Sequence, residues 1–84
     1  MRNTHLQALV GGDIMNSDKL KGKLREKRKT YKECADVLGI GESQFWRKIN
    51  NEVDFWLKEA VDLANYLELS TDEYYAIFMD VENA

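Results

Sequence analysis

Residues 30–51 read TYKECADVLGIGESQFWRKINN, and this stretch decides the fold. It opens with a capping-box pattern from Thr30 to Glu33, in which a hydroxyl and a carboxylate satisfy free amide hydrogens at a helix N-terminus. Gly39 suits the end of that helix, because glycine reaches positive φ without a Cβ clash. Phe45 and Ile49 then lie one helical turn apart. The stretch therefore predicts two short helices, residues 30–38 and 42–50, joined by a tight turn.

The sequence on either side predicts three more helices. Leu20 and Leu24 indicate a first helix over residues 18–27. Residues 55–67 carry apolar side chains at helical spacing behind Asp54 as a candidate cap: Leu57, Ala60, Val61, Ala64 and Leu67. A second capping box, Ser70 to Glu73, starts a helix whose apolar positions are Tyr74, Ile77, Phe78 and Val81. No strand-like alternation competes with this pattern, and the chain has no proline to interrupt it. The prediction is an all-α, compact five-helix domain over residues 17–84.

Residues 1–16 fit this pattern poorly, because glycines at 11 and 12 interrupt any helical periodicity. We interpret them as an N-terminal tail or an appended segment, with Met15 as one candidate for the natural start. The alternative is an ordered arm that packs on the domain or on a partner.

Composition narrows the function classes. The 84 residues are 44% hydrophobic and 32% charged, as expected for one folded domain. The one cysteine cannot form an internal disulfide, and the longest apolar runs are far shorter than the ~20 residues that cross a bilayer. With no convincing secretory signal, a cytoplasmic protein in a bacterial host is expected.

The net charge of −3 averages two unlike halves. Residues 19–48 carry ten Lys or Arg against four acids, a balance of +6. Residues 49–84 carry one base against nine acids, a balance of −8. The overall acidity argues weakly against nucleic acid, but the basic half contains the two helices quoted above. One face that attracts DNA is therefore expected.

The paired helices at residues 30–50 have the form of a helix-turn-helix. Ala35 is small where the two helices must cross closely, and Phe45 and Ile49 bury one side of the second helix. The opposite side is left exposed and carries Glu42, Ser43, Trp46, Arg47 and Asn50.

This segment resembles the helix-turn-helix of the phage Cro and lambda-type repressor family, also called the XRE family. The resemblance rests on Ala35, Gly39 and the apolar positions Leu38, Ile40, Phe45 and Ile49. Over residues 18–79 the chain looks like a small group of phage-encoded Cro-like proteins. It departs from the family at Tyr31, where Gln is frequent, and at Lys48, where an apolar residue is common. The resemblance implies a transcriptional regulator that inserts residues 42–50 into the major groove of operator DNA.

The side chains expected to contact double-stranded DNA share the exposed face of the second helix or flank it. Arg47 suits guanine or a phosphate, Ser43 and Gln44 suit base edges, and Glu42 suits the amino group of cytosine. Lys48, Asn50 and Asn51 stand where phosphates are commonly clamped. The full set is Tyr31, Lys32, Glu42, Ser43, Gln44, Trp46, Arg47, Lys48, Asn50 and Asn51. A homodimer is expected, because one short recognition helix reads few base pairs and a pair reads half-sites ~34 Å apart.

A second hypothesis keeps the scaffold without DNA binding, as a protein-interaction module such as an adaptor or antirepressor. Trp46 and Glu42 favour it, since an exposed tryptophan fits a protein contact equally well. An enzyme is not expected, because Cys34 reads as a core residue and His5 stands alone in the tail. Neither a metal, a cofactor nor a small-molecule ligand is expected.

Overall fold

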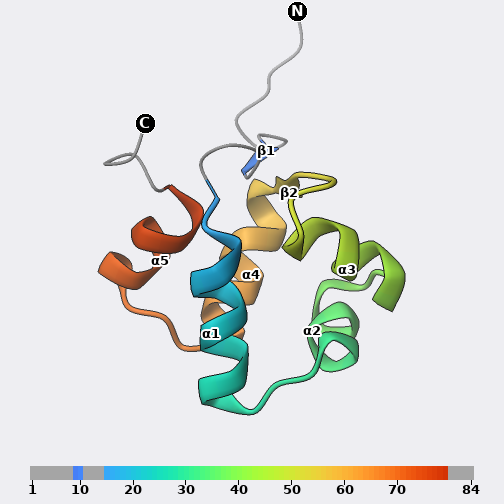
Figure 1. Ribbon diagram of the computed structural model, residues 1–84, viewed down its shortest axis with the longest axis horizontal. Helices are drawn as coiled ribbons and strands as arrows, with labels where there is room; N and C mark the ends of the chain where they lie inside the picture. The colour runs from blue at the N-terminus through green and yellow to red at the C-terminus, as the bar shows by residue number, and fades with distance from the viewer. Residues whose placement is uncertain (1–8, 11–14, 80–84) are drawn as a thin grey trace, which may run out of the picture.

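A computed structural model describes residues 9–10 and 15–79. The elements follow in the order β1 (Leu9–Val10), α1 (Ser17–Lys27), α2 (Tyr31–Leu38), α3 (Glu42–Ile49), β2 (Phe55–Trp56), α4 (Leu57–Tyr66) and α5 (Thr71–Phe78). The predicted all-α domain with five helices is confirmed. In Figure 1, α1 has α5 on one side and the α2–α3 pair on the other, with α4 behind it. Of the residues named above, His5 and Val81 lie outside the described part.

Both predicted capping boxes are present. The Thr30 amide donates to Glu33 Oε1 at 2.8 Å, and the Glu33 amide donates to Thr30 Oγ1 at 3.0 Å. The bond from the Thr30 amide also holds the pKa of the Glu33 carboxyl below its usual value. Ser70 and Glu73 repeat the arrangement at the start of α5. These bonds satisfy amides that a helix N-terminus otherwise leaves free, so each helix start is fixed by its own sequence.

The start of α4 differs from the sequence prediction. Phe55 and Trp56 are extended, and they pair antiparallel with Val10 and Leu9 to form a two-stranded ladder. Helix α4 therefore begins at Leu57, where the Trp56 amide donates to Glu59 Oε1 at 3.0 Å. Asp54 is not the cap. The sequence of residues 55–67 does not reveal this, because the strand partner lies far away in the chain, at residues 9–10.

The core is a chain of aromatic side chains that links the helices. Phe45 of α3 contacts Phe55 of β2 at 6.0 Å between ring centroids, and Phe55 contacts Phe78 of α5 at 5.7 Å. All three side chains are fully buried, and their edge-to-face geometry is the favoured one for aromatic pairs. Phe55 lies inside, while its neighbour Trp56 is 45% exposed. Val61 is 42% exposed, because it lies at the edge of the apolar stripe of α4.

Residues 15–17 bind the ends of two other helices. The Asn16 amide donates to the Ile77 carbonyl of α5 at 2.7 Å, and the Ser17 hydroxyl donates to the Ile49 carbonyl of α3. Met15 is only 4% exposed, and Asn16 caps α1 by accepting from the Lys19 amide. Met15 and Asn16 therefore pack on the helices. Among the helices of residues 15–79, none is long and apolar enough to cross a membrane.

Candidate nucleic-acid interface

Helix α3 divides cleanly into a buried side and an exposed side. Phe45 and Ile49 are fully buried, and they hold the helix against the core. Since a helix turns 100° per residue, Glu42, Ser43, Trp46 and Arg47 face away from this contact, and all four are exposed. Trp46 keeps 47% of its surface exposed despite its size. The exposed side predicted from the sequence is therefore present.

The turn before α3 determines the direction in which the exposed side of α3 faces. Gly39 ends α2 with φ at 71°, the left-handed conformation that glycine adopts without strain. The Ile40 amide then donates to the Ala35 carbonyl at 3.0 Å, which closes the end of α2. Ala35 is buried, as expected of the small residue between the two helices. The predicted helix-turn-helix is thus formed by short-range contacts.

Five of the ten expected contact residues line one open hollow of about 560 Å³, namely Tyr31, Glu42, Ser43, Trp46 and Arg47. The Tyr31 ring packs edge-on against Phe45 with centroids 5.5 Å apart, so the wall contributed by α2 is held by the core. The side chains of Glu42, Ser43 and Arg47 make no hydrogen bond or ion pair with any residue that the structure describes. The hollow therefore combines a carboxylate, a hydroxyl, a guanidinium and two aromatic surfaces, all open to solvent.

The other side chains of the expected set have different surroundings. Gln44 is exposed, but its Oε1 accepts from the Gly41 amide at 3.1 Å and so caps α3. Lys32 is exposed next to Tyr31 and forms an ion pair with Asp36 at 3.5 Å. Such an exposed pair is weak, because water screens it, and the Lys32 ammonium remains accessible to an anion.

Lys48 is not on this surface, which corrects the expectation that it clamps a phosphate. It is 7% exposed, and its ammonium lies 2.9 Å from Glu59 and donates to the Asp54 carbonyl at 3.0 Å. Because Lys48 follows Phe45 by three residues, it points to the core side of α3. The charge is compensated inside the protein and links the end of α3 to the start of α4.

Asn50 and Asn51 also bind the protein itself. Asn50 donates to the Trp46 carbonyl at 2.9 Å and accepts from the Lys21 ammonium at 2.6 Å. Asn51 has φ at 63° and donates to the Met15 carbonyl at 3.4 Å. These bonds attach the C-terminal end of α3 to α1 and to the segment before it. The two side chains therefore position α3.

The basic run of the sequence is spread over several helices. Lys23 forms ion pairs with Glu73 of α5 and with Glu26 of its own helix, and Lys29 lies 4.8 Å from the centroid of the Tyr66 ring. These contacts direct part of the positive charge toward α4 and α5. The sequence does not reveal the contacts with Glu73 and Tyr66, because these partners are far from Lys23 and Lys29 in the chain.

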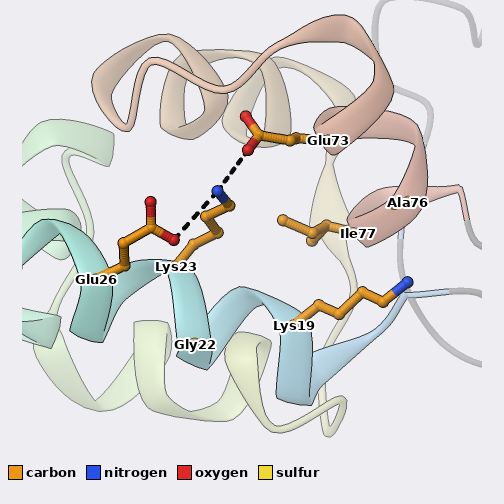
Figure 2. Close-up of a pocket in the computed structure, with 7 residues that line it drawn as sticks. All are labelled: Lys19, Gly22, Lys23, Glu26, Glu73, Ala76 and Ile77. Atoms are coloured by element: carbon orange, nitrogen blue, oxygen red, sulfur yellow. Dashed lines mark hydrogen bonds and ion pairs between the residues drawn. The ribbon is translucent and has the colours of Figure 1, made fainter.

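A second hollow, of about 380 Å³, separates α1 from α5 (Figure 2). Lys23 lies between the carboxylates of Glu26 and Glu73, while Gly22, Ala76 and Ile77 line the apolar part. The Lys23 hydrogen bond lowers the pKa of Glu73 to about 2, and the same bond raises the pKa of Lys23. This arrangement serves as a contact between α1 and α5.

Cys34 is fully buried, and desolvation raises the pKa of its thiol to about 11. A thiol in this state is not a nucleophile at neutral pH. Within residues 9–10 and 15–79, no cluster of three His, Cys, Asp or Glu side chains is placed to hold a metal ion.

Comparison with models of known protein families gave no match, and comparison with curated protein sequences gave none.

Proposed function

We propose that the protein is a sequence-specific DNA-binding regulator of transcription, of the phage or prophage type, that inserts α3 into the major groove of operator DNA. The observation that supports this most is the exposed side of α3, where Ser43, Trp46 and Arg47 point to solvent while the opposite side is buried. A major groove about 12 Å wide admits one helix. In this proposal the protein acts in the bacterial cytoplasm.

Each exposed side chain has a chemical role in this proposal. Arg47 donates two hydrogen bonds to guanine O6 and N7, and Ser43 donates to or accepts from a neighbouring base edge. Tyr31 and Lys32, at the start of α2, bind phosphates beside the groove. Glu42 repels phosphates and accepts from an amino group on a base. The face therefore suits base edges at its centre and phosphates at its rim.

The length of α3 supports a two-fold assembly. Its eight residues extend about 12 Å at 1.5 Å per residue, which spans only three to four base pairs. Two copies on half-sites ~34 Å apart would read a longer sequence and gain specificity. We therefore propose a homodimer on DNA.

The test is selection from a random duplex library with the full chain, followed by titration of the enriched sequence. Arg47→Ala is expected to weaken binding by about 10- to 100-fold and to relax the preference at one base position. Lys58→Ala, which removes an exposed base from α4, is the matched control and is expected to stay within about twofold. Absence of any enriched sequence at low salt contradicts the proposal.

A protein-interaction module is the second candidate function, favoured by the 47% exposure of Trp46 and by the neighbouring Glu42, whose carboxylate has no ion-pair partner among residues 9–10 and 15–79. Tryptophan is enriched in the buried centre of interfaces between proteins. This candidate predicts no enrichment from the DNA library. It also predicts that Trp46→Ala abolishes binding to a partner protein while Arg47→Ala affects it less.

A further inference from the structure

The exposed side of α3 consists of two parallel rows of side chains. Glu42 and Trp46 form one row, and Ser43 and Arg47 form the next, each pair separated by four residues. Residues four apart on a helix lie about 6 Å from each other, so each row presents two groups to the same small area. The Glu42–Trp46 row thus combines a hydrogen-bond acceptor with a large apolar surface.

The chemistry of this row matches one feature of the major groove. Base edges there are polar except for the methyl group at position 5 of a pyrimidine, which is the apolar group that a side chain can contact. Trp46, with 47% of its surface exposed, offers the indole face that such a methyl group would cover. Tyr31 closes the hollow on the α2 side and is held by its contact with Phe45. One wall of the hollow is therefore held by the core, and Trp46 contributes an apolar surface to its lining.

Glu42 adds a requirement for an amino group on the base pair that carries the methyl group. An exposed carboxylate is repelled by phosphates and accepts from an exocyclic amino group, either N6 of adenine or N4 of cytosine. Both amino groups occur in base pairs that can carry a 5-methyl group. In an A·T pair the methyl group belongs to thymine, and in a methylated G·C pair 5-methylcytosine carries the methyl and the amino group together.

We infer that Trp46 is a specificity-determining residue that recognises a pyrimidine 5-methyl group in the major groove, with Glu42 accepting from the amino group of the same base pair. The inference rests on the proposed function and deepens it by naming the chemical group that is read. The methyl group belongs either to thymine or to 5-methylcytosine, and the experiment below distinguishes these two bases.

The experiment uses the full chain and the duplex obtained by selection. Each thymine in turn is replaced by uracil, which lacks only the methyl group, and each cytosine in turn is replaced by 5-methylcytosine. At one position the wild type is expected to lose about fourfold in affinity with uracil, or to gain about fourfold with 5-methylcytosine, because one buried methyl group contributes that much. The first result assigns thymine as the source, and the second assigns methylated cytosine.

Variants of Trp46 show whether its side chain causes the dependence of affinity on the methyl group. Trp46→Ala is expected to bind the methylated and unmethylated forms equally at that position. Trp46→Phe keeps an aromatic ring and should retain part of the difference. Trp56→Ala is the matched control, since it removes a tryptophan of similar exposure outside α3 and should leave the methyl dependence intact.

Wild-type binding that is unchanged by methylation at every position would overturn the inference and leave the proposed function standing. Methyl dependence that persists in Trp46→Ala would overturn it as well. Failure of the wild type to bind any duplex at low salt would overturn the proposed function, and the inference with it. The two failures are therefore distinguishable.

Discussion

The buried ion pair between Lys48 and Glu59 allows a quantitative test of how α3 is held. Their side chains are 9% and 14% exposed, and the ammonium and carboxylate are 2.9 Å apart. Lys48→Met replaces the charge with an apolar side chain of similar length. It leaves Glu59 buried without its counter-charge, and it leaves the Asp54 carbonyl without its donor. Removing one partner of a buried pair costs about 3–5 kcal/mol.

We expect the low end of that range, about 3 kcal/mol, because Glu59 still accepts from the Trp56 amide. For a domain of this size that corresponds to a fall in Tm of about 12–24 °C. The double variant Lys48→Met, Glu59→Met removes both charges and should lose only about 1 kcal/mol, since two apolar side chains replace a costly pair. The double variant is therefore expected to be more stable than Lys48→Met alone.

The assay is urea unfolding followed by circular dichroism, with the free energy of unfolding extrapolated to water. Lys58→Met serves as the control, because Lys58 and Asp62 form an exposed pair at 2.8 Å that is worth less than about 1 kcal/mol. The single variant Glu59→Met completes the cycle. If the effects of Lys48→Met and Glu59→Met add to the effect of the double variant within about 0.5 kcal/mol, the pair is not coupled and the reasoning is refuted.

Three further predictions concern single residues. The hydrogen bond from Lys23 lowers the pKa of Glu73 from its usual 4.5 to about 2, so the stabilising contribution of Glu73 should be present above pH 4.5 and lost as pH falls toward 2. The difference in urea midpoint between wild type and Glu73→Gln should shrink over that interval, and a constant difference would contradict the role of Lys23. Cys34 should react with a thiol reagent at pH 8 only slowly in the folded protein and rapidly in urea, because its pKa is about 11 and it is buried; equal rates would show that the site is open. Gly39→Ala should lose about 1 kcal/mol in urea unfolding, because φ is 71°, while Gly41→Ala, with φ at −75°, should be near neutral; equal effects would contradict the conformational explanation.

Local patterns predicted the helices well. The capping boxes at Thr30 and Ser70 and the glycine at position 39 act within a few residues, so their bonds could be anticipated from spacing alone. The exposed side of α3 follows equally directly from the burial of Phe45 and Ile49. These features depend on neighbours along the helix.

Long-range contacts explain what the sequence did not predict. Asn50 and Asn51 bind Lys21 and Met15, which are 29 and 36 positions away, and nothing in the local sequence indicates such partners. For Lys48 a signal does exist, because it lies three residues after Phe45 and therefore on the buried side of the helix. Its partner Glu59 lies eleven residues further along the chain, and nothing near Lys48 in the sequence indicates that pair.

The bonds made by residues 15–17 have a consequence for how the domain unfolds. The amide of Asn16 and the hydroxyl of Ser17 bind carbonyls at residues 77 and 49, so these two residues close loops that include most of residues 15–79. Fraying of the first helical turn would release the ends of α3 and α5 at the same moment, leaving two carbonyls without donors. Opening at this end therefore costs two long-range hydrogen bonds in addition to the helical turn itself, and this coupling favours cooperative unfolding over stepwise loss of helices.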